Sequence, residues 1–255
     1  MSSRRAEVRP AAPASPAVGQ PRWRERPLEA VLFDLDGTLL DTAADIATAL
    51  NRAIGEQGWA PVGEDQVRRM IGRGAPTLVT RTAAAQSRRL SAELRTALVE
   101  RFFHHYGALQ EDQTFTARPY EGADRTLRRL HEAGLRLAVV TNKQQRFATG
   151  LLQRLGLSGW VDLVVGGDSC ERRKPDPQPL LYACEALHVG AERTLMVGDS
   201  VNDVLAARAA DIPVVCVPHG YNEGQDPRTL DCDALLDTLD DLPTMLLRPP
   251  LPQPA

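Results

Sequence analysis

The sequence has few aromatic residues, few cysteines and no long apolar run. Aromatic residues make up 5% of the chain, too few for the stacking platforms that bind single-stranded nucleic acids. The four cysteines lie far apart and form no Cys-x-x-Cys pair, which favours reduced thiols over a disulfide framework or a zinc site. No run of about 18 apolar residues occurs, so we expect no transmembrane helix and a cytoplasmic location.

The chain also lacks an excess of basic residues. Its formal net charge is −3, which argues against nucleic acid as a partner. Hydrophobic residues make up 43% and charged residues 25%, as in ordinary globular proteins. At 255 residues, one large or two modest domains are expected. These values exclude a wholly disordered chain and a fibrous one. The expected partner is a small molecule and the expected state a monomer or a homodimer, between which the sequence does not decide.

Both ends differ in composition from the rest of the chain. Residues 1–27 hold six arginines and five prolines, and the prolines would interrupt a helix. We predict a disordered tail over 1–27; a transit peptide or a start codon assigned too early are the alternatives. The Pro-rich residues 248–255 are predicted to be loose as well.

Short apolar segments alternate with helical patterns through most of the chain. The apolar segments are rich in Val and Leu, as in strands buried on both faces of a parallel sheet. They lie at 30–33, 135–140, 161–165, 194–197 and 213–217. Helical patterns separate them at 122–133, 147–155, 177–187 and 201–210. This alternation predicts an α/β fold with a doubly wound, Rossmann-like parallel sheet.

Residues 42–115 interrupt this alternation with helical patterns alone. The expected helices lie at 43–55, 64–71, 75–85 and 91–106. We predict a helical cap domain over 42–115, inserted after the first strand of a core domain formed by 28–41 and 116–247. An insertion at the carboxyl end of a strand lies over the edge where such sheets bind ligands.

The first strand is followed by two carboxylates, Asp34 and Asp36. A divalent cation would offset their mutual repulsion. An ionised Asp34 could attack phosphorus, and Asp36 could give a proton to the leaving oxygen and later take one from water. A β-hairpin is the alternative, because Asp-Gly between apolar runs is a strong turn signal.

Polar residues also follow the later strands. Thr141 and Asn142 could donate to phosphate oxygens, although both are common helix caps. Lys174, before a helix that opens with proline, offers a positive charge for phosphate and for Asp34. Asp199 would converge with the first two carboxylates on a metal ion, and Asp203 could bind metal-bound water or hold Lys174.

The chain resembles the haloacid dehalogenase superfamily in four motifs that stand in the family's order. They are DLDGTL at 34–39, TN at 141–142, KP at 174–175 and GDSVND at 198–203. Within the superfamily, the chain resembles the bacterial phosphoglycolate phosphatases most. LLDTAADIATALN at 39–51, IGRGA at 71–75 and HGYNEG at 219–224 carry that likeness.

The resemblance implies a fold, a reaction and a cofactor. The helical insertion would be a C1 cap, and Asp34 would form an aspartyl-phosphate intermediate. Mg²⁺ would be held by Asp34, Asp36 and Asp199, with Asp36 using its backbone carbonyl and keeping its carboxyl as acid and base. The substrate would be a small phosphomonoester such as 2-phosphoglycolate.

Arg73 is the one cap residue that we predict to contact the substrate. It lies between Gly72 and Gly74 in a break between two expected helices. A guanidinium suits a planar carboxylate, so Arg73 could meet the non-phosphate end.

Three alternatives compete with this function, two of them enzymes and one a signalling module. A sugar-phosphate phosphatase, for example for N-acetylmuramic acid 6-phosphate, would differ only in the cap. A phosphomutase would require a phosphoenzyme that survives water. A receiver-type signalling module also phosphorylates an aspartate, but the length of the insertion and the position of Asp34 after the first strand disfavour it.

Overall fold

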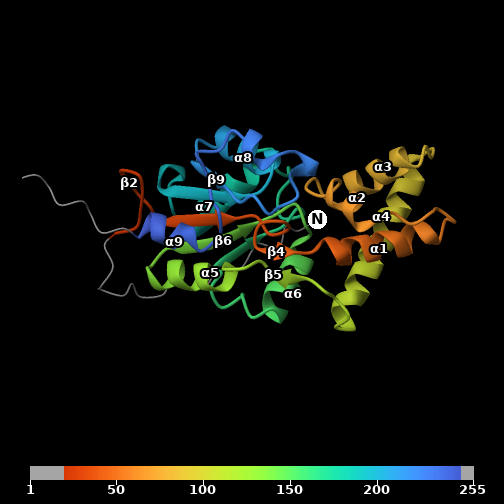
Figure 1. Cartoon of the computed structure of the whole chain (residues 1–255), viewed down its shortest axis with the longest axis horizontal. Helices are drawn as coiled ribbons and strands as arrows, with labels where there is room; N and C mark the ends of the chain where they lie inside the picture. Colours follow the sequence, from red (N-terminus) through yellow and green to blue (C-terminus); the bar gives the residue numbers. More distant parts are fainter. Residues whose placement is uncertain (1–19, 248–255) are drawn as a thin grey trace, which may run out of the picture.

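In the computed structural model, which describes residues 20–247, a six-stranded parallel sheet forms the centre of the larger part of the molecule (Figure 1). Its strands, in spatial order, are β10 (Ala234–Leu235), β9 (Val214–Cys216), β8 (Thr194–Gly198), β3 (Ala30–Phe33), β6 (Arg136–Val140) and β7 (Leu163–Val165). The neighbours β8, β3 and β6 pair in register, with Phe33 opposite both Val197 and Val139. Their carboxyl ends therefore meet at one edge.

Apolar residues on both faces of the strands explain why helices cover the sheet on two sides. Val31 and Phe33 pack in one buried cluster, and Ala30 and Leu32 pack in another on the opposite face, because successive strand residues point to opposite faces. The first face is covered by α5 (Ala123–Glu132), α6 (Gln145–Arg154) and α9 (Asp241–Leu246). The second is covered by α7 (Gln178–Leu187) and α8 (Val201–Ala209). The predicted fold class is confirmed.

Four helices beyond β3 form the smaller part of the molecule, at the right in Figure 1. They are α1 (Ala43–Gly55), α2 (Glu64–Arg68), α3 (Ala75–Ala85) and α4 (Ala92–Glu111). They share a buried cluster in which Leu50, Leu98 and Tyr106 are almost fully enclosed. We call these helices the cap and the sheet with its helices the core.

The two connections between core and cap lie side by side. β4 (Leu40–Asp41) on the outgoing connection pairs antiparallel with β5 (Arg118–Pro119) on the returning one. The alternative hairpin at Asp36-Gly37 is therefore wrong, since β3 pairs with β6 and β8 while β4 pairs with β5. The exact division into domains at 41/42 and 115/116 remains a prediction.

The structure corrects part of the predicted N-terminal tail. Residues 1–19 lie outside the described residues, as do the predicted loose residues 248–255. Residues 22–27, however, form an antiparallel pair of β1 (Arg22–Trp23) and β2 (Arg26–Pro27). Trp23 is only 5% exposed and packs into the core cluster, so one large apolar ring orders a segment whose Arg and Pro content suggested disorder.

Short elements complete the chain. Three 3₁₀ turns lie at Ala191–Arg193, Asn222–Gly224 and Pro227–Thr229. Helices α2 and α4 differ in length from the prediction, α2 ending at Arg68 and α4 continuing to Glu111. Among the described helices, none combines the length and the apolar character needed to cross a lipid bilayer.

Candidate active site

The polar residues that follow β3, β6 and β8 gather at one edge of the sheet. Asp34 comes directly after β3, Thr141 after β6 and Asp199 after β8. Because these strands are neighbours and run parallel, their ends place the three side chains together beneath the cap. The expectation that these strand ends converge is met.

Three buried carboxylates form the centre of this edge. Asp34, Asp199 and Asp203 each offer an oxygen, and these oxygens lie within 4.8 Å of one another. Burial raises the pKa of Asp34 to about 6, although the nearby ammonium of Lys174 opposes the shift. Burial also raises the pKa of Asp199 to about 8, reinforced by the negative charges of Asp203 and Asp34. The negative charges of such a cluster repel one another, and a bound cation would reduce that repulsion.

The donor set suits a hard divalent metal ion. Carboxylate oxygens are the ligands preferred by Mg²⁺, Ca²⁺ and Mn²⁺. Thr38 donates its hydroxyl to one oxygen of Asp199 (2.8 Å), and the backbone N–H of Tyr221 donates to the other (2.8 Å). A Cβ on Gly220 would lie 2.1 Å from the Cβ of Asp199, so only glycine lets this loop approach so closely. The residues present fit a candidate acidic metal site.

Lys174 contacts both Asp34, the predicted nucleophile, and Asp203 in the first turn of α8. Its Nζ lies 2.9 Å from Asp34 and 2.7 Å from Asp203, and the residue is 3% exposed. Burial alone would lower the pKa of Lys174, but Asp203 and Asp34 outweigh it and raise that pKa, so the side chain stays charged. The expectation that Asp203 holds Lys174 agrees with this contact. Asp203 also accepts from the Ser200 hydroxyl (2.7 Å), which caps α8.

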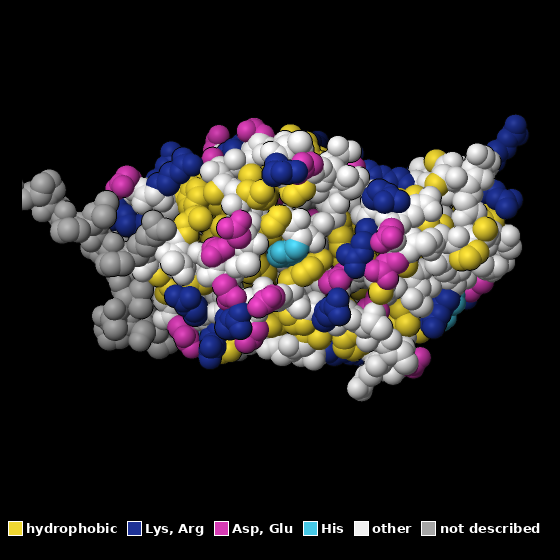
Figure 2. Space-filling model, in the orientation of Figure 1, with side chains coloured by type: hydrophobic (Ala, Val, Ile, Leu, Met, Phe, Trp, Pro, Cys, Tyr) yellow, Lys and Arg dark blue, Asp and Glu magenta, His cyan; other side chains and the backbone are white. Residues whose placement is uncertain are grey.

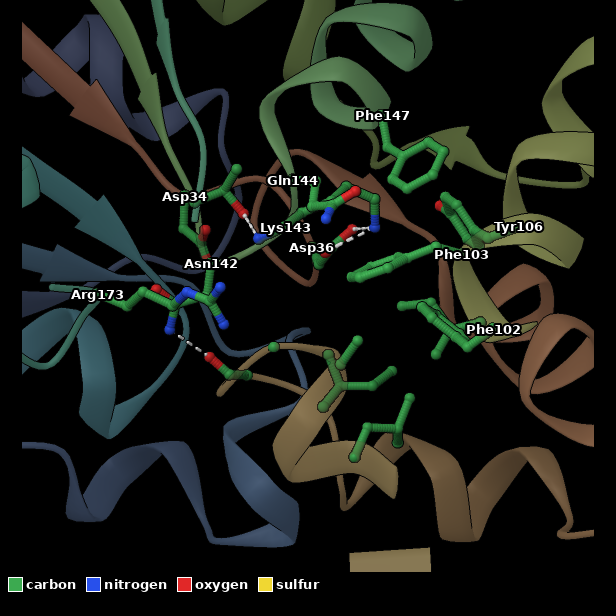
Figure 3. A pocket seen from close by; sticks show the side chains of 17 residues that line it. Asp34, Asp36, Phe102, Phe103, Tyr106, Asn142, Lys143, Gln144, Phe147 and Arg173 are labelled. Atoms are coloured by element: carbon green, nitrogen blue, oxygen red, sulfur yellow. Dashed lines mark hydrogen bonds and ion pairs between the residues drawn. The ribbon is translucent and has the colours of Figure 1, made fainter. Parts of the chain in front are cut away.

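Asp36 faces a different partner. Both of its carboxylate oxygens lie 2.8 Å from Nζ of Lys143, and Thr42 donates its hydroxyl to one of them (2.7 Å). The carboxylate of Asp36 is not part of the acidic cluster of Asp34, Asp199 and Asp203. It is thus held apart from that cluster, at the wall of a neighbouring pocket (Figure 3).

The pocket between core and cap has mostly apolar walls (Figure 3). Asp34, Asp36 and Thr141 lie on its core side. The cap and α6 supply the apolar walls, formed by Ile46, Ile71, Leu78, Phe102, Phe103, Tyr106 and Phe147. This lining could not be predicted from the sequence, because it depends on how the cap packs over the core.

Asn142 does something different from the predicted phosphate contact. Its side-chain amide donates to the carbonyl of Gly72 in the cap (2.8 Å) and to the carbonyl of Lys174 (2.9 Å). Both hydrogens of the amide are thereby used. Thr141 is buried and lines the pocket, and its contact with phosphate stays a prediction.

Arg73 is not brought to the pocket. Its side chain is 44% exposed, and Nε lies 2.7 Å from Glu223 of the core. Arg81 of α3 binds the other oxygen of Glu223 (2.7 Å). Figure 2 shows basic and acidic side chains gathered where cap and core meet. The cations that line the pocket are instead Lys143 and Arg173, which the sequence reasoning did not select.

Known proteins similar to this chain share its architecture. The family model described as haloacid dehalogenase-like hydrolase matches residues 31–217. The phosphoglycolate phosphatase of Nitrosospira multiformis is 44% identical over 214 residues, which cover 84% of this chain and 93% of the relative. A plasmid-encoded phosphoglycolate phosphatase of Cupriavidus necator is 42% identical over 222 residues, 86% of this chain and 94% of the relative.

A solved structure shows the same likeness in three dimensions. The crystal structure of a predicted phosphoglycolate phosphatase from Haemophilus somnus superposes with a TM-score of 0.79 at 30% identity. The match covers 86% of this chain and 97% of that one. The similarity therefore extends over both core and cap.

Proposed function

This chain belongs to the haloacid dehalogenase-like hydrolases, and from that premise we propose that it is a Mg²⁺-dependent phosphatase that converts 2-phosphoglycolate to glycolate and inorganic phosphate. The observation that carries the proposal is the position of Asp34. It is buried at the carboxyl end of β3, 2.9 Å from Lys174 and beside Asp199. The proposed substrate rests on the similarity to phosphoglycolate phosphatases, and the proposed reaction rests on the residues around Asp34.

Asp34 is the proposed nucleophile. Its carboxylate attacks phosphorus and forms an aspartyl phosphate, while the bond from phosphorus to the glycolate oxygen breaks. Lys174 places a positive charge beside Asp34, where it can bind phosphate oxygens, and the Thr141 hydroxyl is a second donor. These contacts orient the phosphoryl group for attack.

Asp36 is the proposed acid and base. It gives a proton to the oxygen of the departing glycolate, then takes one from the water that attacks the aspartyl phosphate. Lys143 and Thr42 fix its carboxylate through three contacts of 2.7–2.8 Å, which holds it in one orientation. The cap excludes bulk water from the pocket during the first step.

Asp34, Asp199 and the backbone carbonyl of Asp36 are the proposed ligands of Mg²⁺. When bound, the ion would neutralise charge on the buried carboxylates and on the phosphate. Asp203 is a less suitable ligand, because one of its oxygens is paired with the ammonium of Lys174 and the other already accepts from the Ser200 hydroxyl and from two backbone N–H groups. The cytoplasmic location and the monomeric or homodimeric state remain predictions from the sequence.

The proposed function is tested by release of inorganic phosphate from a panel of phosphoesters, with and without EDTA. We expect 2-phosphoglycolate to have the highest kcat/KM and EDTA to abolish turnover. Preference for a sugar phosphate would replace the proposed substrate with the nearest alternative. Transfer of phosphate between sugar hydroxyls would indicate a phosphomutase, and no release from any ester would reject the phosphatase.

A further inference from the structure

The pocket beside Asp36 presents a problem for a small substrate with two charged ends. Its apolar walls are mainly aromatic and aliphatic, with Phe102 and Phe103 from the cap and Phe147 from α6. A carboxylate that enters such surroundings loses its hydration, and it binds well only if charged or polar donors replace the water. A substrate that carries a second anion therefore requires such donors in this pocket.

Lys143 is one donor within the pocket. Its side chain is 7% exposed, and its Nζ contacts both oxygens of Asp36 at 2.8 Å. An ammonium that contacts both oxygens of a carboxylate keeps its positive charge at neutral pH. An ammonium has three hydrogens, which leaves capacity for a further acceptor.

Tyr106 of the cap is a second donor. The residue is 2% exposed, and its buried hydroxyl interacts with Lys143, which can only donate, so within the described part of the chain no group accepts the hydrogen of this hydroxyl. Figure 3 shows this hydroxyl on the side of the ring that faces Lys143 and Asp36, and Nζ of Lys143 lies 4.7 Å from the ring centre. Burial raises the pKa of Tyr106 to about 12, so its O–H keeps its hydrogen. A buried hydroxyl whose hydrogen has no acceptor is unfavourable until a ligand accepts from it.

The position of Asp36 connects these donors with the leaving group. Asp36 is the residue proposed to protonate the leaving oxygen, and Lys143 is bound directly to it. A carboxylate one carbon away from that oxygen would therefore lie close to Lys143. Arg173, the other cation at the pocket, is exposed, and among the described residues it is Lys143 that forms the ion pair with Asp36.

We propose that the ammonium of Lys143 and the hydroxyl of Tyr106 together bind a carboxylate on the leaving group of the substrate, and so select acid-bearing phosphoesters. This inference rests on the proposed function and names the residues that determine its specificity. It also assigns to Lys143 and Tyr106 the contact that the sequence suggested for Arg73.

The experiment compares two substrates that differ only at this group. The measured quantity is kcat/KM for 2-phosphoglycolate divided by kcat/KM for 2-hydroxyethyl phosphate, in which CH₂OH replaces the carboxylate. Tyr106→Phe removes one oxygen and keeps the ring, and we expect it to lower this ratio about tenfold, as for one lost hydrogen bond to a charged group. Lys143→Gln should lower the ratio by about tenfold to a hundredfold.

This ratio of kcat/KM values distinguishes lost recognition of the carboxylate from a general loss of activity that affects both substrates equally. Lys143→Gln also disturbs Asp36, so kcat should fall on both substrates, but that loss cancels in the ratio. Arg73→Gln is the matched control, because Arg73 is a cap cation paired with Glu223 outside the pocket, and we expect it to leave the ratio unchanged. An unchanged ratio in both Tyr106→Phe and Lys143→Gln would overturn the inference while leaving the phosphatase intact.

A binding measurement makes the result independent of turnover. In an Asp34→Asn background, calorimetric titration with 2-phosphoglycolate should give a Kd about tenfold weaker when Tyr106→Phe is added. An equal Kd in both proteins would contradict the proposed contact. If the wild-type enzyme released no phosphate from 2-phosphoglycolate but did so from other esters, the proposed substrate would fail. The inference would then stand only if acid-bearing esters exceeded their neutral counterparts and Tyr106→Phe removed that preference.

Discussion

Asp34 and Asp199 are buried carboxyl groups, and burial makes their ionised forms less favourable than in water. Their pKa values are raised to about 6 and about 8 from an ordinary 3.8. The folded metal-free protein therefore binds protons that the unfolded chain has already released above pH 4. These two groups therefore add to the free energy of unfolding in full below about pH 4. That contribution is lost as the pH rises through about 6 for Asp34 and about 8 for Asp199.

We predict that Asp199→Asn stabilises the metal-free protein at high pH. In EDTA, the free energy of unfolding of the variant should exceed that of the wild type by at least about 1 kcal/mol at pH 8, because a neutral amide replaces a carboxylate that must ionise. At pH 5 the difference should be smaller, since Asp199 is then protonated. Chemical denaturation at the two pH values measures this.

Excess Mg²⁺ should reverse this difference and make the wild type the more stable protein at pH 8, because only the wild type keeps all the proposed ligands of the ion. A difference between the proteins that is the same at pH 5 and pH 8 in EDTA would contradict the assignment of the raised pKa.

The sequence was informative about residues whose role follows from position along the chain. Asp34, Thr141 and Asp199 could be found because each directly follows a buried strand. Lys143 and Tyr106 could not, because they meet only where the cap packs against the core, 37 residues apart in sequence but in contact across the pocket. Arg73 was selected for its glycine neighbours, yet Glu223, from a distant loop, determines where its side chain lies.

At the scale of elements, the connections between core and cap are fixed by one buried carboxylate. Asp45 in the first turn of α1 is 3% exposed. One of its oxygens accepts from the backbone N–H (2.7 Å) and hydroxyl (2.8 Å) of Thr116, and the other accepts from the N–H of Ala117 (2.9 Å). The returning connection is thus anchored to the helix that begins the cap.

We predict that Asp45→Ala lowers the free energy of unfolding by about 2–4 kcal/mol, because it leaves buried backbone N–H groups without an acceptor. Urea denaturation measures this change. Asp112→Ala, at the exposed C-terminal cap of α4, is the control and should change stability by less than about 0.5 kcal/mol. Equal effects of the two substitutions would show that Asp45 does not anchor the connection.

The N-terminal strands give a second prediction at this scale. Deleting residues 1–19 should leave thermal stability unchanged, whereas deleting 1–27 should lower it, because only the longer deletion removes Trp23 from the core cluster. Trp23→Ala in the full chain should cost about 3 kcal/mol. If both deletions were equally stable, the packing of Trp23 would contribute nothing to the fold.

Strands and helices with strong patterns were predictable, and short elements were not. The apolar run at 30–33 matches β3, and the helical patterns at 43–55 and 75–85 match α1 and α3. The two-residue strands β4, β5 and β10 have no periodicity of their own and form only through their partners. The hairpin of β1 and β2 could not be predicted from composition, because it depends on the packing of the single side chain of Trp23.

At the scale of the whole molecule, the site exists only where cap and core meet. The core supplies Asp34, Asp36 and Lys143, while the cap supplies Tyr106 and most of the apolar walls. Contacts between the two parts hold this arrangement. They include Asn142 with Gly72, Glu223 with Arg73 and Arg81, and Tyr221 with Thr42 and Asp41.

Asp34 is proposed to carry the phosphoryl group during hydrolysis, and trapping the aspartyl phosphate tests this role. Acid quenching of the enzyme during turnover of ³²P-labelled 2-phosphoglycolate should leave label on the protein, which peptide mapping places on Asp34. Asp34→Asn should carry no label and lose more than about a thousandfold in kcat. Steady turnover without labelled protein, together with more than about a tenth of wild-type kcat in Asp34→Asn, would contradict the account.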